Sequence, residues 1–266
     1  MDLLIDTCVL PRACLQEALY YPEHTDIPLG FELLPMFDLP DFQDNLEANL
    51  SVFQGRPLVF HEPVWGVEHT APMGTHAYDA SMYHILLTLK YARILRPTHM
   101  VYHLNNCRVD ETSRKEMLAT TLENLEEMKF LFDFLTIVVE NTGTVTDKNR
   151  LLDQDEFTDL CIKHEFDVLI DVGHANANGW DLPKLITDLK TQIRGFHLHN
   201  NDGIHDLHSR LPDGTLNFDT LMPFIAKTVP DAFWVIEYTR PLFHKEALLM
   251  DIRRLDSFRK MGEIKE

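Results

Sequence analysis

Several apolar segments of this chain end at a carboxylate or an imidazole. Residues 137–139, for example, read Ile-Val-Val and run directly into Glu140. A buried carboxylate is destabilising unless it is paired or bound to a metal ion, and few Lys or Arg lie in the flanking sequence. In chain order, the end residues are His61, His103, Glu140, Asp171, His199 and Glu237. These side chain types predict a divalent metal site, and the imidazoles favour Zn or Mn over Ca.

Two further stretches add candidate ligands. His174 follows Asp171 closely, and residues 200–208 carry Asp206 and His208 on one side of an extended segment. Because side chains alternate along a strand, His197 shares a strand face with His199. A substrate contact and a barrel-filling role are both open for His197.

The elements that would position these residues alternate between short apolar and longer amphipathic segments, a pattern typical of repeated β-α units. Strands are expected at 3–9, 30–36, 57–61, 99–103, 135–140, 167–171, 194–199 and 233–237. Helical patterns include 78–95, 111–134, 182–189, 219–227 and 244–261. The turn after the first strand lacks the glycines of a doubly wound sheet. The sequence therefore predicts an α/β fold, a (β/α)8 TIM barrel forming one domain over 1–266, in which all strand ends meet on one face.

Composition limits the partners that we expect. The chain has 24 basic and 42 acidic residues, a formal net charge of −18, which repels a phosphate backbone and disfavours nucleic acid. No apolar stretch is long enough to span a membrane. The four cysteines form no CxxC pair and the first residues lack a basic signal region, so we expect reduced thiols and a cytoplasmic protein. The oligomeric state is open, a homo-oligomer included.

Other residues near the strand ends are candidate substrate contacts, each with a structural alternative. An aromatic side chain can form a lid or pack in its loop, a buried acid can reach hydroxyls or fill the barrel, and an arginine can bind an anion or remain in solvent. The candidates are Glu32, Trp65, His69, Trp180, His197 and Arg210.

Five motifs give the chain a resemblance that extends over nearly its whole length. They are VVENTG (138–143), IDVGHAN (170–176), HLHNNDG (197–203), DLHSRLPDGTLNF (206–218) and VIEYT (235–239). The pattern resembles the xylose isomerase-like TIM barrel superfamily, which includes sugar phosphate isomerase/epimerase proteins and AP endonuclease family 2.

The resemblance implies a metal site and its ligands. In the superfamily, one Glu, one Asp, one His and a second Glu hold the shared ion, which here implies Glu140, Asp171, His199 and Glu237. The similarity to endonuclease IV implies three zinc ions, with His61 and His103 beside one ion and Glu140 bridging to the next. His174, Asp206 and His208 would surround another ion. One to three ions per chain are therefore expected.

The expected function is that of a metal-dependent isomerase, epimerase or related lyase. A small sugar, sugar phosphate or polyol would react through a metal-stabilised enediolate, with Glu140 and Glu237 as the catalytic carboxylates. One alternative is a trinuclear phosphodiesterase, similar to endonuclease IV, that acts on abasic DNA. A second alternative is a metal-loaded barrel that binds a ligand without turnover.

Overall fold

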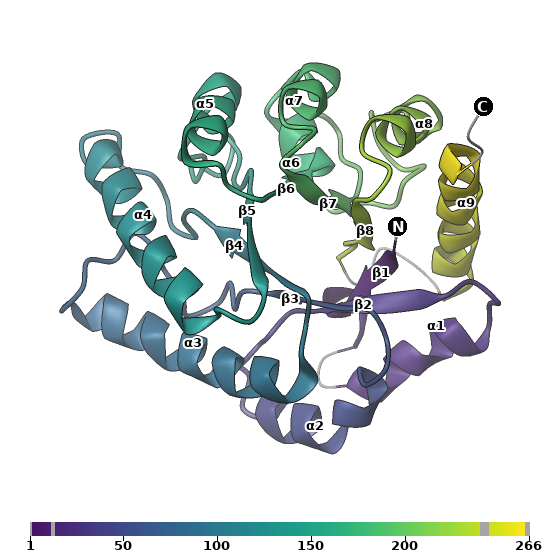
Figure 1. Ribbon diagram of the computed structural model, residues 1–266, viewed down its shortest axis with the longest axis horizontal. Helices are drawn as coiled ribbons and strands as arrows, with labels where there is room; N and C mark the ends of the chain where they lie inside the picture. The colour runs from purple at the N-terminus through teal and green to yellow at the C-terminus, as the bar shows by residue number, and fades with distance from the viewer. Residues whose placement is uncertain (1, 12–13, 240–244, 264–266) are drawn as a thin grey trace.

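Eight parallel strands close into one barrel in the order β1 to β8 (Figure 1). The structure, a computed structural model, describes residues 2–11, 14–239 and 245–263. The strands are β1 (Leu3–Asp6), β2 (Leu29–Leu33), β3 (Leu58–His61), β4 (His99–His103), β5 (Thr136–Glu140), β6 (Val168–Asp171), β7 (Ile193–Leu198) and β8 (Phe233–Ile236). The predicted single-domain (β/α)8 barrel is confirmed.

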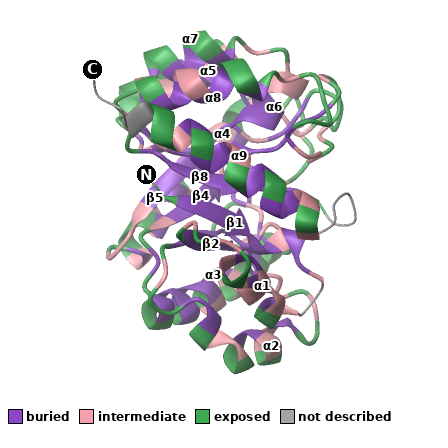
Figure 2. Cartoon of the chain, turned by 90° about the vertical axis from the view of Figure 1, so that its right-hand side faces the viewer, coloured by how far each residue is buried: buried purple, intermediate pink, exposed green. Residues whose placement is uncertain are grey.

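Helices surround the barrel and present their exposed faces outward, while the strands are almost entirely buried (Figure 2). The helices are α1 (Tyr20–Glu23), α2 (Phe42–Ala48), α3 (His76–Leu95), α4 (Arg114–Leu131), α5 (Gln154–His164), α6 (Val172–Ala177), α7 (Leu182–Asp188), α8 (Phe218–Thr228) and α9 (Lys245–Glu263). In the described part of the chain, no helix has the length and apolar character needed to cross a membrane.

The main differences from the sequence prediction lie near the amino-terminal strands. The first strand ends at Asp6, because the Asp6 side chain caps a 3-10 turn over Thr7–Val9. The second strand ends at Leu33, three residues before its predicted end. Helices α1, α2, α5 and α6 lie outside the helical patterns named from the sequence. The last predicted helix matches α9, although its first residue, His244, lies outside the described residues.

The barrel interior is built in two layers of inward-facing side chains. The lower layer is apolar and contains Leu4, Val59, Val101, Val138, Leu169 and Val235, with Phe233 one inward position before Val235 on β8. Because inward positions recur every second residue, the next inward layer starts two residues further along each strand. That upper layer contains Asp6, Glu32, His61, His103, Glu140, Asp171, His197 and Glu237, all buried except the half-buried His103. The strand pattern thus explains why titratable groups from every strand meet above an apolar floor.

The loop after β7 is fastened to α9 by a two-pronged ion pair. Arg210 donates from Nε and from one terminal nitrogen to the two carboxylate oxygens of Asp251, both at 3.0 Å. The Tyr238 hydroxyl also donates to Asp251, at 3.2 Å. We expected Arg210 to contact substrate, but its guanidinium is engaged with α9. It anchors the segment that carries Asp206 and His208.

This anchor predicts a large stability effect at Arg210. Changing Arg210→Met should destabilise the protein by about 3 kcal/mol, because it leaves the buried Asp251 carboxylate without its cation. Urea unfolding would measure the difference. The matched control is Arg254→Ala, which removes an ion pair with the well-exposed Asp219 and should change stability by less than about 1 kcal/mol. Equal effects of the two changes would contradict the anchoring role.

Candidate metal centre

Glu140 is shared between two groups of candidate ligands at the carboxyl end of the barrel. Its Oε2 lies 3.0 Å from His103 Nε2 and 3.8 Å from His61 Nε2. Its Oε1 lies 3.0 Å from His174 Nδ1. We call His61, His103 and Glu140 the first group; they come from β3, β4 and β5.

The second group consists of Glu140 from β5 together with Asp171 and His174, which lie where β6 turns into α6. Asp171 caps the helix, since its Oδ1 accepts a hydrogen bond from the His174 backbone N–H. Its Oδ2 lies 3.6 Å from His174 Nδ1. The Asn141 side chain bonds both the N–H and the carbonyl of Asp171, at 2.8 and 3.0 Å. A capped helix start and a clamped backbone together fix where the Asp171 carboxylate points.

The third group is His174, His199, Asp206 and His208. Asp206 Oδ2 lies 3.2 Å from the Nε2 atoms of both His174 and His208. The rings of His199 and His208 stack with their centroids 3.9 Å apart. His174 belongs to this group as well as to the second, so the groups share members. Eight of the nine candidate metal ligands named from the sequence fall in these three groups, and the ninth, Glu237, forms a further group with Asp171 and His197.

A glycine makes room for the His199 ring beside α6. A Cβ atom added at Gly173 would lie 1.9 Å from an atom of the His199 ring. Any larger residue at this position would displace the imidazole. The glycine in the VGH sequence is thus a packing requirement of the third group.

His197 lies at the centre of the carboxylates and is fully buried. Its Nδ1 is 3.1 Å from Glu237 Oε2, 3.5 Å from Glu140 Oε2 and 3.7 Å from Asp171 Oδ2. Its Nε2 is 3.0 Å from Glu32 Oε1. The two open roles for His197 were substrate contact and barrel filling. In the structure, it and Glu32 contact other site residues inside the barrel.

The arrangement of these atoms fits bound cations. Several buried nitrogen and oxygen atoms lie close to oppositely charged groups but form no hydrogen bond with them. They are Glu140 Oε1, His174 Nδ1, His197 Nδ1, Asp206 Oδ1 and Glu237 Oε2. Lone pairs that converge without hydrogen bonds suit a metal ion, and mixed imidazole and carboxylate donors suit Zn or Mn. Within residues 2–11, 14–239 and 245–263, no Lys or Arg pairs with these carboxylates.

The same groups strongly shift one another's pKa values. Burial alone would lower the pKa of His103, but the Glu140 carboxylate raises it to about 9. Burial would likewise lower the pKa of His208, but Asp206 and Glu237 raise it to about 10. Burial would raise the pKa of Glu237, yet His197 and His208 hold it well below its usual range. The carboxylates of the site therefore favour positive charge on the imidazoles beside them.

The remaining expected contacts differ in their surroundings. Trp65 lies on the segment after β3 and is 49% exposed. Trp180 is half-buried and packs against Phe157, with ring centroids 6.1 Å apart. His69 is 2% exposed and paired with Glu62, so it faces the protein interior and not the solvent side of the site. Substrate contact remains a prediction for Trp65, while packing accounts for Trp180 and His69.

Sequence reasoning missed several residues that support the centre. Glu62 follows His61 directly, and Asn106 bonds the outer nitrogen of the His103 ring at 2.8 Å. Asp6 ends β1 in the upper layer beside Glu32, with which it is paired in strand register. The strand alternation would have revealed Asp6, since it stands two residues after the inward-facing Leu4.

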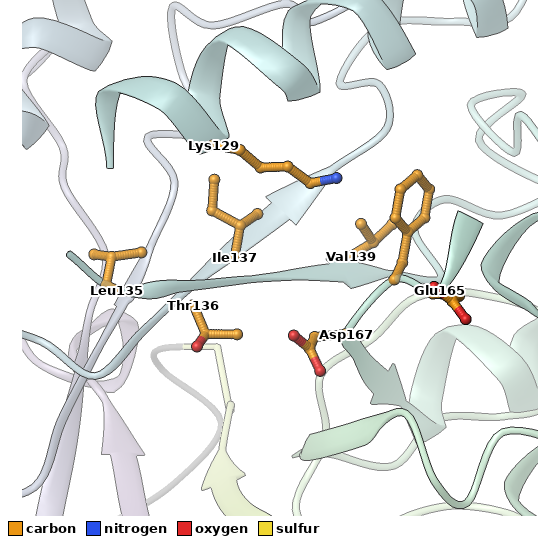
Figure 3. Close-up of a pocket in the computed structure, with 8 residues that line it drawn as sticks. Lys129, Leu135, Thr136, Ile137, Val139, Glu165 and Asp167 are labelled. Carbon is orange, nitrogen blue, oxygen red and sulfur yellow. The ribbon is translucent and has the colours of Figure 1, made fainter. Parts of the chain in front are cut away.

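A separate pocket lies beside β5, between α4 and the turn into β6 (Figure 3). Its lining residues are Lys129, Leu135, Thr136, Ile137, Val139, Glu165, Phe166 and Asp167. Thr136 begins β5 and Asp167 directly precedes β6, so the pocket lies toward the amino ends of these strands. Among the described residues, no group of candidate metal ligands includes a residue from this lining. The chemistry-bearing groups are thus concentrated at the other end of the barrel.

Solved structures with the same fold include sugar-epimerase-like proteins and an endonuclease. A D-tagatose 3-epimerase-like protein superposes with a TM-score of 0.78 at 16% identity, covering 98% of each chain. The IOLI protein with a binding zinc atom gives 0.75 at 12% identity and covers 100% of each chain. Endonuclease IV from Thermus thermophilus gives 0.69 at 16% identity, covering 98% of this chain and 99% of that one. At such identities the likeness establishes the fold.

Sequence comparison is consistent with this fold. Among curated protein sequences, none matches the chain. A family model described as xylose isomerase-like TIM barrel matches residues 16–257, which is most of the chain. The protein therefore belongs to the xylose isomerase-like TIM barrel family.

Proposed function

We propose that this protein is a divalent-metal-dependent isomerase or epimerase of a small sugar, sugar phosphate or polyol. The observation that carries the proposal is the buried cluster of imidazoles and carboxylates at the carboxyl end of the barrel. Enzymes of this fold place their chemistry at that end. A bound divalent ion would supply a Lewis acid for a carbonyl or hydroxyl oxygen of the substrate.

The two candidate catalytic carboxylates differ in their surroundings. The Glu140 side chain is 1% exposed and lies between His103 and His174, so its role is to join two ligand groups. The Glu237 side chain is 12% exposed and lies at the edge of the cluster, beside His197 and His208. Proton transfer requires contact with the substrate. We therefore assign proton transfer at the substrate carbon to Glu237, and the ligand-bridging role to Glu140.

The surface charge supports a small substrate. A net charge of −18 opposes the approach of duplex DNA, which is held mainly by Lys, Arg and backbone contacts to phosphates. Arg210, one of the few basic residues near the strand ends, is engaged with Asp251. Trp65 is exposed and offers an aromatic face against which a sugar ring can pack.

A second candidate function is a trinuclear phosphodiesterase acting on abasic DNA. The observation that favours it is the third ligand group, in which Asp206 and His208 join His174 and His199. Three groups that share members suit three ions, as in a phosphoryl-transfer site. A ligand-binding barrel without turnover is the remaining alternative, and the activity assay below also tests it.

A parallel assay separates these functions. We expect the protein loaded with Zn or Mn to convert at least one member of a panel of ketoses, aldoses and their phosphates. We expect no efficient incision of an abasic duplex, because binding a duplex requires phosphate contacts that this acidic chain lacks. Incision that weakens steeply with salt, with no sugar converted, would assign the phosphodiesterase function instead. No turnover of any substrate by the fully loaded protein would leave the ligand-binding alternative.

Changing Glu237→Gln should abolish turnover without emptying the site. The amide can still offer an oxygen to an ion, but it cannot take up a proton at neutral pH. We expect kcat to fall by about 10²–10⁴-fold, the usual contribution of a positioned acid or base. Elemental analysis of the same sample would show whether metal is retained. If kcat were unchanged at wild-type metal content, proton transfer would have to be assigned elsewhere.

Metal uptake should release protons and strengthen as the pH rises. The pKa values of about 9 for His103 and about 10 for His208 mean that at pH 7 both rings are positively charged, with a proton on each nitrogen. An ion must displace these protons, so affinity should rise between pH 7 and 9 by up to about tenfold per unit for each proton displaced. Calorimetry in buffers of different ionisation enthalpy counts the released protons. Uptake without proton release, at an affinity independent of pH, would contradict this account.

A further inference from the structure

The outer ring nitrogens of two candidate ligands contact groups that can only accept a hydrogen bond. His61 Nδ1 lies 2.8 Å from the Glu62 carbonyl oxygen, and His208 Nδ1 lies 3.0 Å from the Glu237 carbonyl oxygen. Each Nδ1 must therefore carry a proton, so that Nε2 is the nitrogen that can offer its lone pair to a metal ion. The backbone sets the ring tautomer at these two positions.

His103 lacks such a backbone partner. Its Nδ1 lies 2.8 Å from the Asn106 side-chain amide, a group that can either donate or accept. The His103 tautomer therefore depends on which way the Asn106 amide is turned.

Two acceptors decide the orientation of the Asn106 amide. Its Nδ2 lies 2.9 Å from Glu62 Oε1 and 3.1 Å from the Val67 carbonyl oxygen. A carbonyl cannot donate, so the NH2 side of the amide must face these two oxygens. The Asn106 Oδ1 is left facing His103, where it accepts a hydrogen bond from Nδ1–H. In the metal-free protein Nε2–H then donates to Glu140 Oε2, 3.0 Å away. Nε2 is the nitrogen that loses its proton when an ion of the first group binds.

The same asparagine is joined to the segment that follows β3. Its backbone N–H donates to Glu68 Oε2 at 3.0 Å. Glu62 is in turn paired with the buried His69. The ring centroids of His69 and of Tyr102 on β4 lie 4.1 Å apart. Asn106 thus connects a candidate metal ligand to a buried, packed set of partners.

We propose that Asn106 is a positioning residue that sets the tautomer and ring orientation of His103 for the ion of the first group. Outer-shell partners of this kind affect metal affinity through the ligand that they hold. The inference rests on the proposed metal-dependent function, but it concerns the ion held by the first group and not the identity of the substrate.

The test compares three variants with the wild type by titration of zinc against a competing chelator. Asn106→Leu removes the hydrogen-bonding amide at nearly constant volume. The double change Asn106→Asp with Glu62→Gln exchanges the two polar groups, so that the new carboxylate can accept from His103 while the new amide donates to that carboxylate. Asn124→Leu is the matched control, because Asn124 donates to the carbonyls of His69 and Ala71 but contacts no candidate ligand.

We expect Asn106→Leu to lower the affinity for one zinc ion by about 10–100-fold and to leave the affinity for other ions unchanged. The exchanged pair should recover part of the affinity, because its carboxylate accepts from His103 while its second oxygen faces the Val67 carbonyl. Asn124→Leu should match the wild type. Thermal unfolding without metal checks that each variant folds. If the leucine variant does not fold, Asn106→Ala replaces it, because alanine removes the amide without adding bulk. The same loss of zinc affinity is expected from that variant.

Three results would overturn the inference, and they separate it from the proposed function. Wild-type affinity in Asn106→Leu, or an equal loss in Asn124→Leu, would show that Asn106 does not orient the ligand. If the wild type held no transition metal, the proposed function and the inference would both fail. Metal binding without conversion of any sugar would affect the proposed function alone.

Discussion

The alternation of side chains along eight strands of a closed barrel is the constraint on which the site depends. Inward positions hold apolar residues in one layer and titratable residues in the layer above. Closing the barrel forces the carboxylates and imidazoles together above an apolar floor, where charge is poorly screened. Since no Lys or Arg of the described residues pairs with these carboxylates, protonated imidazoles or bound metal ions must balance them. Buried carboxylates without such compensation would strongly destabilise the fold.

The supporting structure follows from this requirement. Asn141 clamps the backbone of Asp171, and Gly173 leaves space for the His199 ring. Arg210 is paired with Asp251, so that the loop carrying the third-group ligands is fastened to α9. Each contact holds a site residue in place without occupying the ligand atom that faces the cluster. Such preorganisation is what a metal site with several ligands needs from its surroundings.

Much of this could be predicted from sequence because the strands are short apolar runs that stop at His, Asp or Glu. That pattern indicated the barrel and six of the nine candidate ligand positions, while His174, Asp206 and His208 were indicated by the polar residues that follow β6 and β7. It could not indicate the partner of Arg210, because Asp251 lies 41 residues further along the chain. Likewise, the sequence suggested a substrate contact for His69, but folding pairs it with Glu62 in the interior. Asn106 was missed because an asparagine in a loop has no distinctive signal until its neighbours in space are known.

The central claim is that metal ions neutralise the buried cluster. The most direct measurement is X-ray diffraction from crystals of the zinc-loaded protein, recorded above and below the zinc absorption edge. We predict anomalous peaks among the ligand groups, with Glu140 between two of them if more than one ion is bound. An anomalous map without a peak at these side chains, from a sample shown by elemental analysis to have been fully loaded, would contradict the account.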